Sequence, residues 1–290
     1  MKKILKSLYS VLYNKFRNRF IKVKYNKVTK NFKIIIPSSF EDRAIKTAEM
    51  ITTAFEYARP NIKNSFSMKV SIEDFENQDK TYSYSLNSFS KLNYLIPDFC
   101  FMNWKESGMK DYDECWKEIV EESKKPIQYN TLFWIGNTKT HPSRCTLCQL
   151  SEKDSRIEAY GMDWKYKDGK TIPSKFISLV DHTKYKYLID VQGRGYSGRV
   201  KMLLFTGRPL FLVERKWIEY FYEDLKPYIH YIPVKEDLSD LIEKLDWAEN
   251  HYKEAKQIGQ NAQYYAINNL KRIDAIMYLS KKLEMLSNKK

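Results

Sequence analysis

Residues Tyr187–Arg199 read Y-L-I-D-V-Q-G-R-G-Y-S-G-R, and this stretch decides the fold. An apolar, strand-like run leads into Gly193, Gly195 and Gly198, and a helix-compatible segment follows from Arg199. Glycines in this order let a backbone turn sharply and approach a ligand closely, and the free amides that open the next helix favour an anion. The stretch therefore predicts a strand, a turn and a helix that together hold a phosphate-bearing molecule.

Strand-like and helix-like segments alternate on both sides of Pro126. The expected strands cover residues 31–36, 68–72, 131–135, 185–191, 209–213 and 230–234, and the expected helices cover residues 41–59, 112–124, 143–150, 199–205, 217–224, 237–247, 254–270 and 272–286. This rhythm is typical of α/β layers with mostly parallel sheets. We expect an N-terminal Rossmann-like domain over residues 1–128, a second one over 129–250, and C-terminal helices over 251–290 that pack back across them.

The chain of 290 residues carries 50 Lys and Arg against 36 Asp and Glu, a formal net charge of +14. This excess favours anionic partners such as nucleotides, nucleic acid or an acidic membrane surface. The first 25 residues combine basic and apolar side chains at helical spacing, without the uninterrupted apolar run of a signal peptide. They predict a basic amphipathic helix, which either lies on an anionic membrane or packs on its own domain.

Four cysteines are present, and only Cys145 and Cys148 form a C-x-x-C pair. No histidine or second C-x-x-C pair lies at zinc-finger spacing, so buried or incidental thiols are favoured over a metal or redox site. Nothing indicates a disulfide scaffold, which makes a reducing cytoplasm the default compartment.

The glycine turn leaves two classes of nucleotide ligand open. Glu214 lies 21 residues after Gly193, at the end of the next expected strand, where a dinucleotide dehydrogenase places its ribose-binding acid. An NAD-dependent oxidoreductase is therefore the alternative to an enzyme that uses a nucleotide sugar. A nucleic-acid-binding protein is disfavoured, because the basic residues are spread along the chain and no binding module is present.

A long run between residues 182 and 266 has an unusual composition. It stands as His182, Lys184–Leu188, Ser197–Lys201, Glu219–Tyr222, Leu225–Lys235 and Asp237–Ser239. This run closely resembles the glycosyltransferase family that contains Rumi-type protein O-glucosyltransferases, fungal capsule xylosyltransferases and bacterial lipopolysaccharide-core transferases. The match is too long and too particular for chance.

Two further segments fit the same family more loosely. Phe133–Asn137, followed by Arg144, looks like the family's F-W-R-G-S turn, although Ile135 stands where the family has an arginine. Ile96–Phe99, with Trp104 after it, resembles the P-D-x-x-F-x-x-W segment of the bacterial members.

The resemblance implies a GT-B architecture, in which two Rossmann-like domains face a cleft. The C-terminal half would bind a UDP-sugar and the N-terminal half would offer the acceptor. Members of the family invert the anomeric centre and need no metal, so arginine side chains and backbone amides must neutralise the leaving diphosphate. The residues expected to bind the nucleotide sugar are Gly136, Thr138, Thr140, Arg144, Gly193, Gly195, Tyr196, Ser197, Gly198, Arg199 and Glu214.

The acceptor hydroxyl must lose its proton to a carboxylate. Rumi-type members use the Asp of an R-D-Y-P segment that precedes an F-S-F-S run. The corresponding stretch here is Ser71–Phe75, followed by Tyr82–Ser85, which makes Asp74 the expected general base and Asp98 the alternative. His182 and His230 are expected to have structural roles.

The sequence as a whole predicts an inverting, metal-independent glycosyltransferase. It would move a hexose or pentose (glucose, galactose or xylose) from a UDP-sugar to a hydroxyl of a surface glycan such as the lipopolysaccharide core. No cofactor or metal is expected, and the partners are a UDP-sugar, a glycan or glycolipid acceptor and an anionic membrane surface. The missing signal peptide and the unpaired cysteines favour a cytoplasmic enzyme at the inner membrane.

Overall fold

The computed structural model describes residues 10–14, 19–37, 41–75, 80–87, 93–167 and 170–288. The chain divides into two compact units that are not continuous in sequence. Unit 1 contains residues 1–102, 217–220 and 272–290, and unit 2 contains residues 103–216 and 221–271. Compared with the ranges expected from sequence, residues 103–128 group with the second unit and residues 272–290 with the first.

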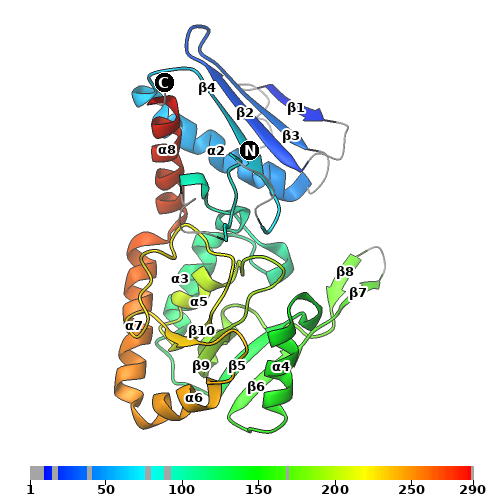
Figure 1. Cartoon of the computed structure of the whole chain (residues 1–290), viewed down its shortest axis with the longest axis vertical. Coiled ribbons are helices and arrows are strands. Elements are labelled where there is room, and N and C mark those ends of the chain that lie inside the picture. The colour runs from blue at the N-terminus through cyan, green and yellow to red at the C-terminus, as the bar shows by residue number, and fades with distance from the viewer. Residues whose placement is uncertain are drawn as a thin grey trace. The chain divides into compact units, whose positions relative to one another are not determined.

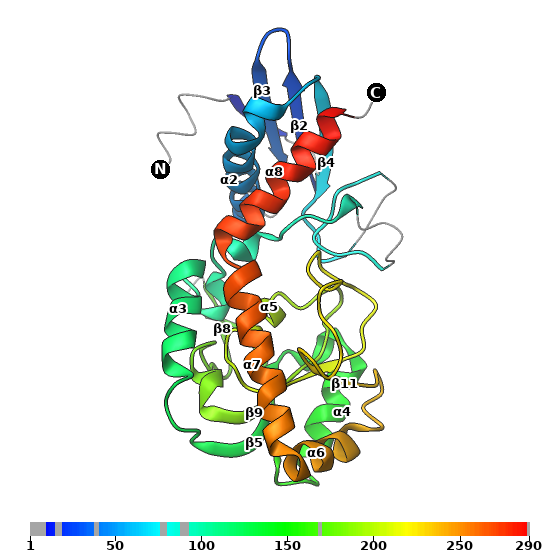
Figure 2. The ribbon, with the colours of Figure 1, turned by 90° about the vertical axis from the view of Figure 1, so that its left-hand side faces the viewer.

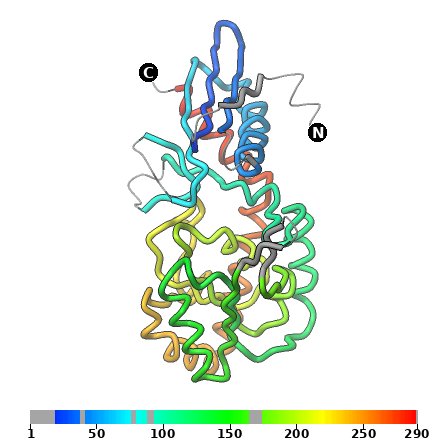
Figure 3. Tube along the Cα trace, turned by 90° about the vertical axis from the view of Figure 1, so that its right-hand side faces the viewer, coloured from blue at the N-terminus to red at the C-terminus, as the bar shows by residue number. Residues whose placement is uncertain are grey.

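Unit 1 contains a four-stranded mixed sheet with the order β1-β3-β2-β4. Its strands are β1 (Ser10–Asn14), β2 (Phe20–Asn26), β3 (Asn31–Pro37) and β4 (Phe66–Ser71). β1 pairs in parallel with β3, whereas β2 is antiparallel to both β3 and β4. The hairpin of β2 and β3, dark blue in Figure 3, turns over residues 27–30. A turn this short joins only antiparallel neighbours, so the described strands of unit 1 form a mixed sheet rather than the parallel Rossmann-like sheet predicted for the N-terminal half.

The basic amphipathic helix predicted for the first 25 residues is also wrong where the structure describes them. Residues 10–14 and 20–26 are strands rather than parts of a basic amphipathic helix, and residues 1–9 and 15–18 lie outside the described residues. In β2 the side chains of Ile21, Val23 and Tyr25 are buried, while Lys22 and Lys24 are exposed. This strict alternation is the period of a strand with one buried face.

Two helices pack on each other in unit 1. They are α2 (Glu41–Ala58) and α8 (Arg272–Asn288), and Figure 2 shows them crossing in front of the strands. Phe55 of α2 stacks on Phe32 of β3 with ring centroids 3.9 Å apart. α2 continues as the 3-10 helix η1 (Arg59–Asn61), which contains Pro60. The helix predicted over residues 41–59 is thereby confirmed, and a proline explains its end.

Unit 2 contains a five-stranded sheet with the order β11-β10-β9-β5-β6, in which every neighbouring pair is parallel (Figure 1). Its strands are β5 (Tyr129–Gly136), β6 (Ile157–Gly161), β9 (Tyr185–Asp190), β10 (Leu210–Val213) and β11 (Ile232–Val234). Four of them were predicted, and β6 was missed. A two-stranded ribbon, β7 (Trp164–Lys167) and β8 (Lys170–Pro173), follows β6. The parallel sheet is of the Rossmann-like kind.

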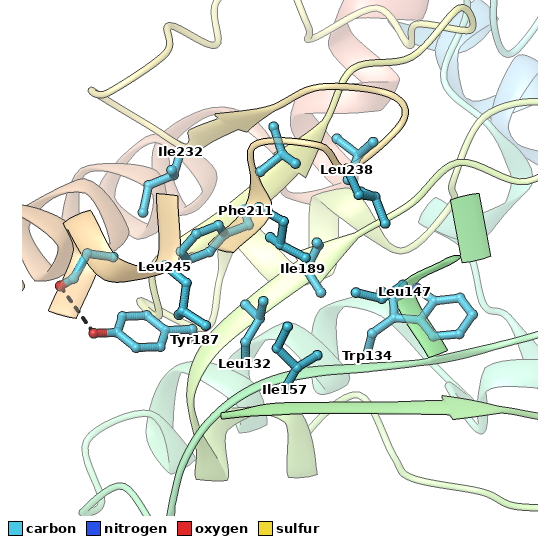
Figure 4. Close-up of a cluster of buried hydrophobic side chains, with 14 of the residues drawn as sticks. Leu132, Trp134, Leu147, Ile157, Tyr187, Ile189, Phe211, Ile232, Leu238 and Leu245 are labelled. Carbon is cyan, nitrogen blue, oxygen red and sulfur yellow. Dashed lines mark hydrogen bonds between the residues drawn. The ribbon is translucent and has the colours of Figure 1, made fainter. Parts of the chain in front are cut away.

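The helices of unit 2 accompany this sheet. They are α3 (Tyr112–Glu122), α4 (Pro142–Ser151), α5 (Val200–Leu204), α6 (Leu241–Asn250) and α7 (Tyr252–Asn269), with short 3-10 turns at η4 (Lys105–Ser107), η5 (Thr138–Thr140) and η6 (Asp181–Lys184). On one face of the sheet, apolar side chains from the strands gather with Leu147 of α4 and Leu245 of α6 (Figure 4). In this core the Tyr187 hydroxyl donates to the Ala248 carbonyl at 3.2 Å. Burial of these apolar side chains stabilises the sheet whose carboxyl edge carries the candidate site.

One predicted helix is wrong. Residues 217–219 are irregular and residues 220–224 form turns, and Ile218 makes an isolated antiparallel bridge with Leu86 instead of a helical hydrogen bond. The two backbone groups of Ile218 are thus used by a distant segment of unit 1, which the local pattern could not show. No helix in the described ranges is long and apolar enough to cross a membrane.

Candidate functional site

The carboxyl ends of three neighbouring parallel strands meet at one edge of the unit 2 sheet. β5 ends at Gly136, β9 at Asp190 and β10 at Val213. Open parallel sheets bind ligands at this edge, because the loops that leave the strands converge there. Most of the nucleotide-binding residues predicted from sequence follow these three strands.

Asp190 is the central carboxylate of this edge and is completely buried. It accepts hydrogen bonds from Ser197 Oγ at 2.8 Å, Arg199 Nε at 3.2 Å and Arg215 Nη1 at 2.9 Å. Burial alone would raise the pKa of this carboxyl, but Arg215 and Arg199 outweigh burial and hold the pKa below its ordinary value. Asp190 is therefore a permanent anion that orients two guanidinium groups.

Arg199, which the sequence predicts to bind the diphosphate, lies at this edge of the sheet beside Asp190. Its Nε is bound to Asp190, and its Nη1 donates to the carbonyl of Ile135 at the end of β5. Among the described residues, Nη2 has no hydrogen-bond partner, and the side chain is 12% exposed. The guanidinium is thus fixed on one side and open on the other.

Arg144 lies on α4 and is nearly buried. It donates to the carbonyls of Gln192, Asn137 and Val191 at 2.9 to 3.0 Å, and so ties the end of β9 to the end of β5. Burial, with help from the positive charges of Arg199 and Arg215, lowers the pKa of Arg144 to about 10. It remains charged at neutral pH.

Arg215 was missed by the sequence prediction, which chose its neighbour Glu214. The Arg215 side chain is 3% exposed. Its Nη1 also donates to the Tyr222 hydroxyl at 3.1 Å, its Nη2 donates to the Asp190 carbonyl at 3.0 Å, and its Nε donates to the Val213 carbonyl at 3.1 Å. Glu214 is exposed. The rule that selected Glu214 asked for a ribose-binding acid at the end of the strand, so it passed over the arginine at the next position.

Three arginines gather around Asp190. Arg199 and Arg215 pair directly with its carboxylate, and Arg144, which donates to backbone carbonyls, lies close enough for the charges of all three groups to affect its pKa. The guanidinium carbons of Arg144 and Arg199 lie 5.4 and 5.8 Å from the ring centre of buried Trp134. Two fixed cations in poorly solvated surroundings suit an anion with two negative charges, such as a diphosphate.

The turn between β9 and α5 differs from the expected glycine cradle. Gly193, Gly195 and Gly198 do not adopt left-handed conformations, which in the described residues occur at Gly108 and Gly207 among the glycines. The helix α5 has five residues. A Cβ on Gly193 would lie 3.4 Å from Arg144 Nη2 and 3.7 Å from Thr140 Oγ1. The positive charge beside this turn therefore comes from arginine side chains, and binding of an anion there stays a prediction.

The remaining predicted residues surround this cluster. Gly136 ends β5, Thr138 and Thr140 lie in η5, and the Thr140 hydroxyl donates to the Asn137 carbonyl at 2.9 Å. Tyr196 is buried, and Lys201 Nζ lies 5.7 Å from the centre of its ring. The structure thus brings the predicted set to one edge of the sheet, and their roles in binding stay predictions.

A polar group of His141, Gln192 and Glu236 lies beside the cluster. Gln192 Nε2 is 3.2 Å from both His141 Nε2 and Glu236 Oε1, and Gln192 Oε1 accepts from the Lys216 amide at 3.2 Å. Burial lowers the pKa of His141, although Glu236 opposes that shift. His141 is therefore neutral at pH 7, and the sequence prediction did not include any of the three.

His182 has the structural role expected for it. Its Nδ1 is 2.7 Å from the Ser178 carbonyl, and its ring meets the edge of Phe133. Burial, assisted by the charge of Arg199, lowers the pKa of His182 to about 4. A neutral imidazole fixed to a carbonyl is a poor candidate for acid–base catalysis at neutral pH.

The two candidate bases lie in unit 1 and differ in exposure. Asp74 has a side chain that is 42% exposed and pairs with Arg43 Nη1 at 2.6 Å. Asp98 is buried and immediately precedes the 3-10 helix η3 (Phe99–Phe101). Of these two carboxylates, only Asp74 is open to solvent.

The two cysteines of the C-x-x-C pair are free thiols on α4. In the part of the chain that the structure describes, no group of three or more His, Cys, Asp and Glu side chains could hold a metal ion. The metal or redox alternative for Cys145 and Cys148 gains no support.

Comparison with known proteins gives a family and several relatives. The family model described as Glycosyl transferase family 90 matches residues 60–288. Protein O-glucosyltransferase 1 of Rattus norvegicus is 36% identical over 155 residues, which cover 51% of this chain and 40% of that protein. The human protein of the same name gives the same identity and coverage, and Protein O-glucosyltransferase 2 of Danio rerio is 39% identical over 107 residues, 37% of this chain and 21% of that protein. The chain spans less than half the length of these relatives.

Proposed function

Because the chain belongs to glycosyl transferase family 90, we propose that it transfers one sugar from a UDP-sugar to an acceptor hydroxyl, with inversion and without a metal ion. The proposal includes a GT-B arrangement, with the donor bound by unit 2 and the acceptor by unit 1. The relatives' names, which describe O-glucosyltransferases, support the same reaction class.

The observation that carries the proposal is the arginine cluster around Asp190. A departing UDP carries its negative charge on the diphosphate, and Arg199 presents a fixed, partly open guanidinium at the carboxyl edge of the sheet. Arg144 adds a second buried cation. Preorganised charges of this kind stabilise a leaving group without needing to reorganise during the reaction.

We assign Asp74 as the general base. As the acceptor oxygen attacks the anomeric carbon, Asp74 takes the hydroxyl proton, and the bond between the anomeric carbon and the phosphate oxygen breaks. The electron pair of that bond leaves with UDP, whose charge the arginine cluster balances. Attack from the face opposite UDP inverts the anomeric centre.

Glucose is the first donor sugar to test, followed by galactose and xylose. The names of the relatives state glucose transfer to proteins, and this supports glucose without fixing it for this chain.

Two acceptor classes follow from different observations. The resemblance to bacterial transferases supports a surface glycan such as lipopolysaccharide core, with Pro97, Asp98 and Trp104 in the relevant segment. The names of the relatives support a protein hydroxyl as the second candidate.

The test is a donor panel with EDTA present. Purified protein is incubated with UDP-glucose, UDP-galactose, UDP-xylose and NAD, each with lipopolysaccharide core oligosaccharide or a folded protein acceptor. UDP release is followed for the UDP-sugars, and NADH absorbance is followed for NAD. We expect turnover of one UDP-sugar and no use of NAD. Failure of every UDP-sugar, or turnover only after a divalent metal is added, would refute the proposal.

A further inference from the structure

Among the residues that the structure describes, one ion pair anchors Asp74 in unit 1. Arg43 Nη1 lies 2.6 Å from Asp74 Oδ1, and Ser85 Oγ donates to the backbone carbonyl of Asp74 at 2.8 Å. Among the described residues, Asp74 Oδ2 has no partner. One carboxylate oxygen is therefore fixed, and the other remains available on a half-exposed side chain.

Arg43 is itself held by its surroundings. It lies in the first turn of α2, and its guanidinium carbon sits 4.8 Å from the centre of the Phe99 ring. The Thr47 hydroxyl lies 2.8 Å from the Arg43 carbonyl and 2.5 Å from the hydroxyl of buried Tyr84. A guanidinium stacked on an aromatic ring loses little further freedom when it binds a carboxylate.

The other charges near Asp74 have different partners. Lys46, one turn further along α2, lies 5.3 Å from the same Phe99 ring and pairs with Asp42. Glu73 pairs with Arg19. Two cations therefore lie over the Phe99 ring. Arg43 pairs with Asp74, and Lys46 pairs with Asp42.

We infer that Arg43 is the positioning residue for the catalytic base, an inference that rests on the proposed function, in which Asp74 is that base. A carboxylate that accepts a proton must present one oxygen at a fixed place, because a misplacement of about 1 Å can cost on the order of 100-fold in rate. Arg43 binds Oδ1 and thereby aims Oδ2 at the acceptor hydroxyl. It acts through Asp74 and does not itself take the proton.

The test compares Arg43→Gln, Arg43→Lys and the matched variant Lys46→Met in the transfer assay. We expect Arg43→Gln to lower kcat about 10- to 100-fold while KM for the UDP-sugar changes less than about twofold. Arg43→Lys restores a cation near Oδ1 and should recover most of the loss. Lys46→Met removes a cation from the same aromatic ring without touching Asp74, so its kcat should stay within about threefold of the parent value.

A double-mutant cycle with Asp74→Asn separates the inference from the proposed function. If Arg43 acts through Asp74, Arg43→Gln should add less than about twofold in the Asp74→Asn background. An unchanged kcat in Arg43→Gln, or an equal loss in Lys46→Met, would overturn the inference while the base assignment stands. Full transfer by Asp74→Asn would overturn both, and thermal unfolding of each variant shows whether a loss reflects misfolding.

Discussion

Asp190 in unit 2 and Asp74 in unit 1 are two carboxylates in opposite environments. Asp190 is fully buried and accepts side-chain hydrogen bonds from a serine and two arginines. Asp74 is 42% exposed and has one arginine on one oxygen. Both oxygens of the Asp190 carboxylate accept hydrogen bonds from protein side chains. Among the described residues, one oxygen of Asp74 has no partner and can contact a substrate.

This difference in burial suits Asp190 to orienting the arginines and Asp74 to accepting a proton. A buried carboxylate surrounded by guanidinium groups is stabilised as an anion and is unavailable as a base at neutral pH. A carboxylate with one fixed and one open oxygen can accept a proton from a substrate. Burial and the number of partners therefore assign different roles to two residues of the same type.

The largest effect is expected from Asp190→Asn. The substitution removes the charge and places an amide NH₂ against guanidinium groups, so the buried Arg215 loses the carboxylate to which its Nη1 donates. Breaking a buried ion pair by removing one partner costs about 3–5 kcal/mol, and we expect a loss of this size in the free energy of unfolding, measured with urea. Ser197→Ala is the matched control, because it removes one hydrogen bond from an uncharged donor to the same carboxylate and should cost less, about 1.5–3 kcal/mol.

The same variant tests the sign of the pH dependence. Since the folded-state pKa of Asp190 lies below its ordinary value of 3.8, its charge stabilises the fold above about pH 4. That contribution is lost as the pH falls through the lowered folded-state pKa. Unfolding of the parent protein in acid should therefore include a component that Asp190→Asn lacks, and identical acid dependence in both proteins would contradict the assignment.

Asp74→Asn should abolish most transfer and leave the donor site intact. Removing a general base typically costs about 10²- to 10⁴-fold in kcat, and UDP affinity should not change because the residue lies in unit 1. Steady-state kinetics and calorimetric titration measure the two quantities. Asp98→Asn is the matched comparison: a large loss there, with Asp74→Asn active, would move the base to Asp98.

Arg199→Ala should weaken UDP binding by about 10- to 100-fold, since a charge-assisted hydrogen bond contributes about 1.5–3 kcal/mol. Arg156→Ala is the matched control. Arg156 also belongs to unit 2, but it pairs with Asp154, Asp246 and Glu249 rather than with the cluster. If the parent and Arg199→Ala bound UDP with equal affinity, the proposed diphosphate site would be wrong.

The smallest effect is expected from Gly193→Ala. A Cβ there meets its nearest neighbour at 3.4 Å, so the free energy of unfolding should change by less than about 1 kcal/mol. In Gly259→Ala the Cβ would lie 2.5 Å from the Gly207 carbonyl oxygen, and a loss of about 1–3 kcal/mol is expected. A loss at Gly193 as large as at Gly259 would restore the glycine-cradle interpretation.

The parallel sheet of unit 2 was largely predictable because its strands are short apolar runs. Residues 210–213 are all buried, and such runs between turns are typical of parallel sheets. The strand predicted over residues 31–36 is β3, but β2 was not recognised, since the lysines of residues 20–26 also fit a helical face. Buried and exposed residues alternate along this segment, which is the two-residue period of a strand. The sequence prediction instead used the helical period of 3.6 residues.

The candidate site was predictable in part for a similar reason. Glycines and Arg199 stand out in sequence, and position along a strand suggests the edge where they meet. Asp190 and Arg215 acquire their significance only from the pairing of β9 with β10, which brings their side chains to 2.9 Å. No local pattern contains that contact.

The central claim is that the arginine cluster around Asp190 holds a diphosphate. Calorimetric titration of the parent protein with UDP and with UMP, in EDTA, tests it most directly, because the two ligands differ by one phosphate. We expect UDP to bind at least about tenfold more tightly than UMP, as one further charge-assisted contact would give. Equal affinities, or UDP binding that appears only with a divalent metal, would contradict the account.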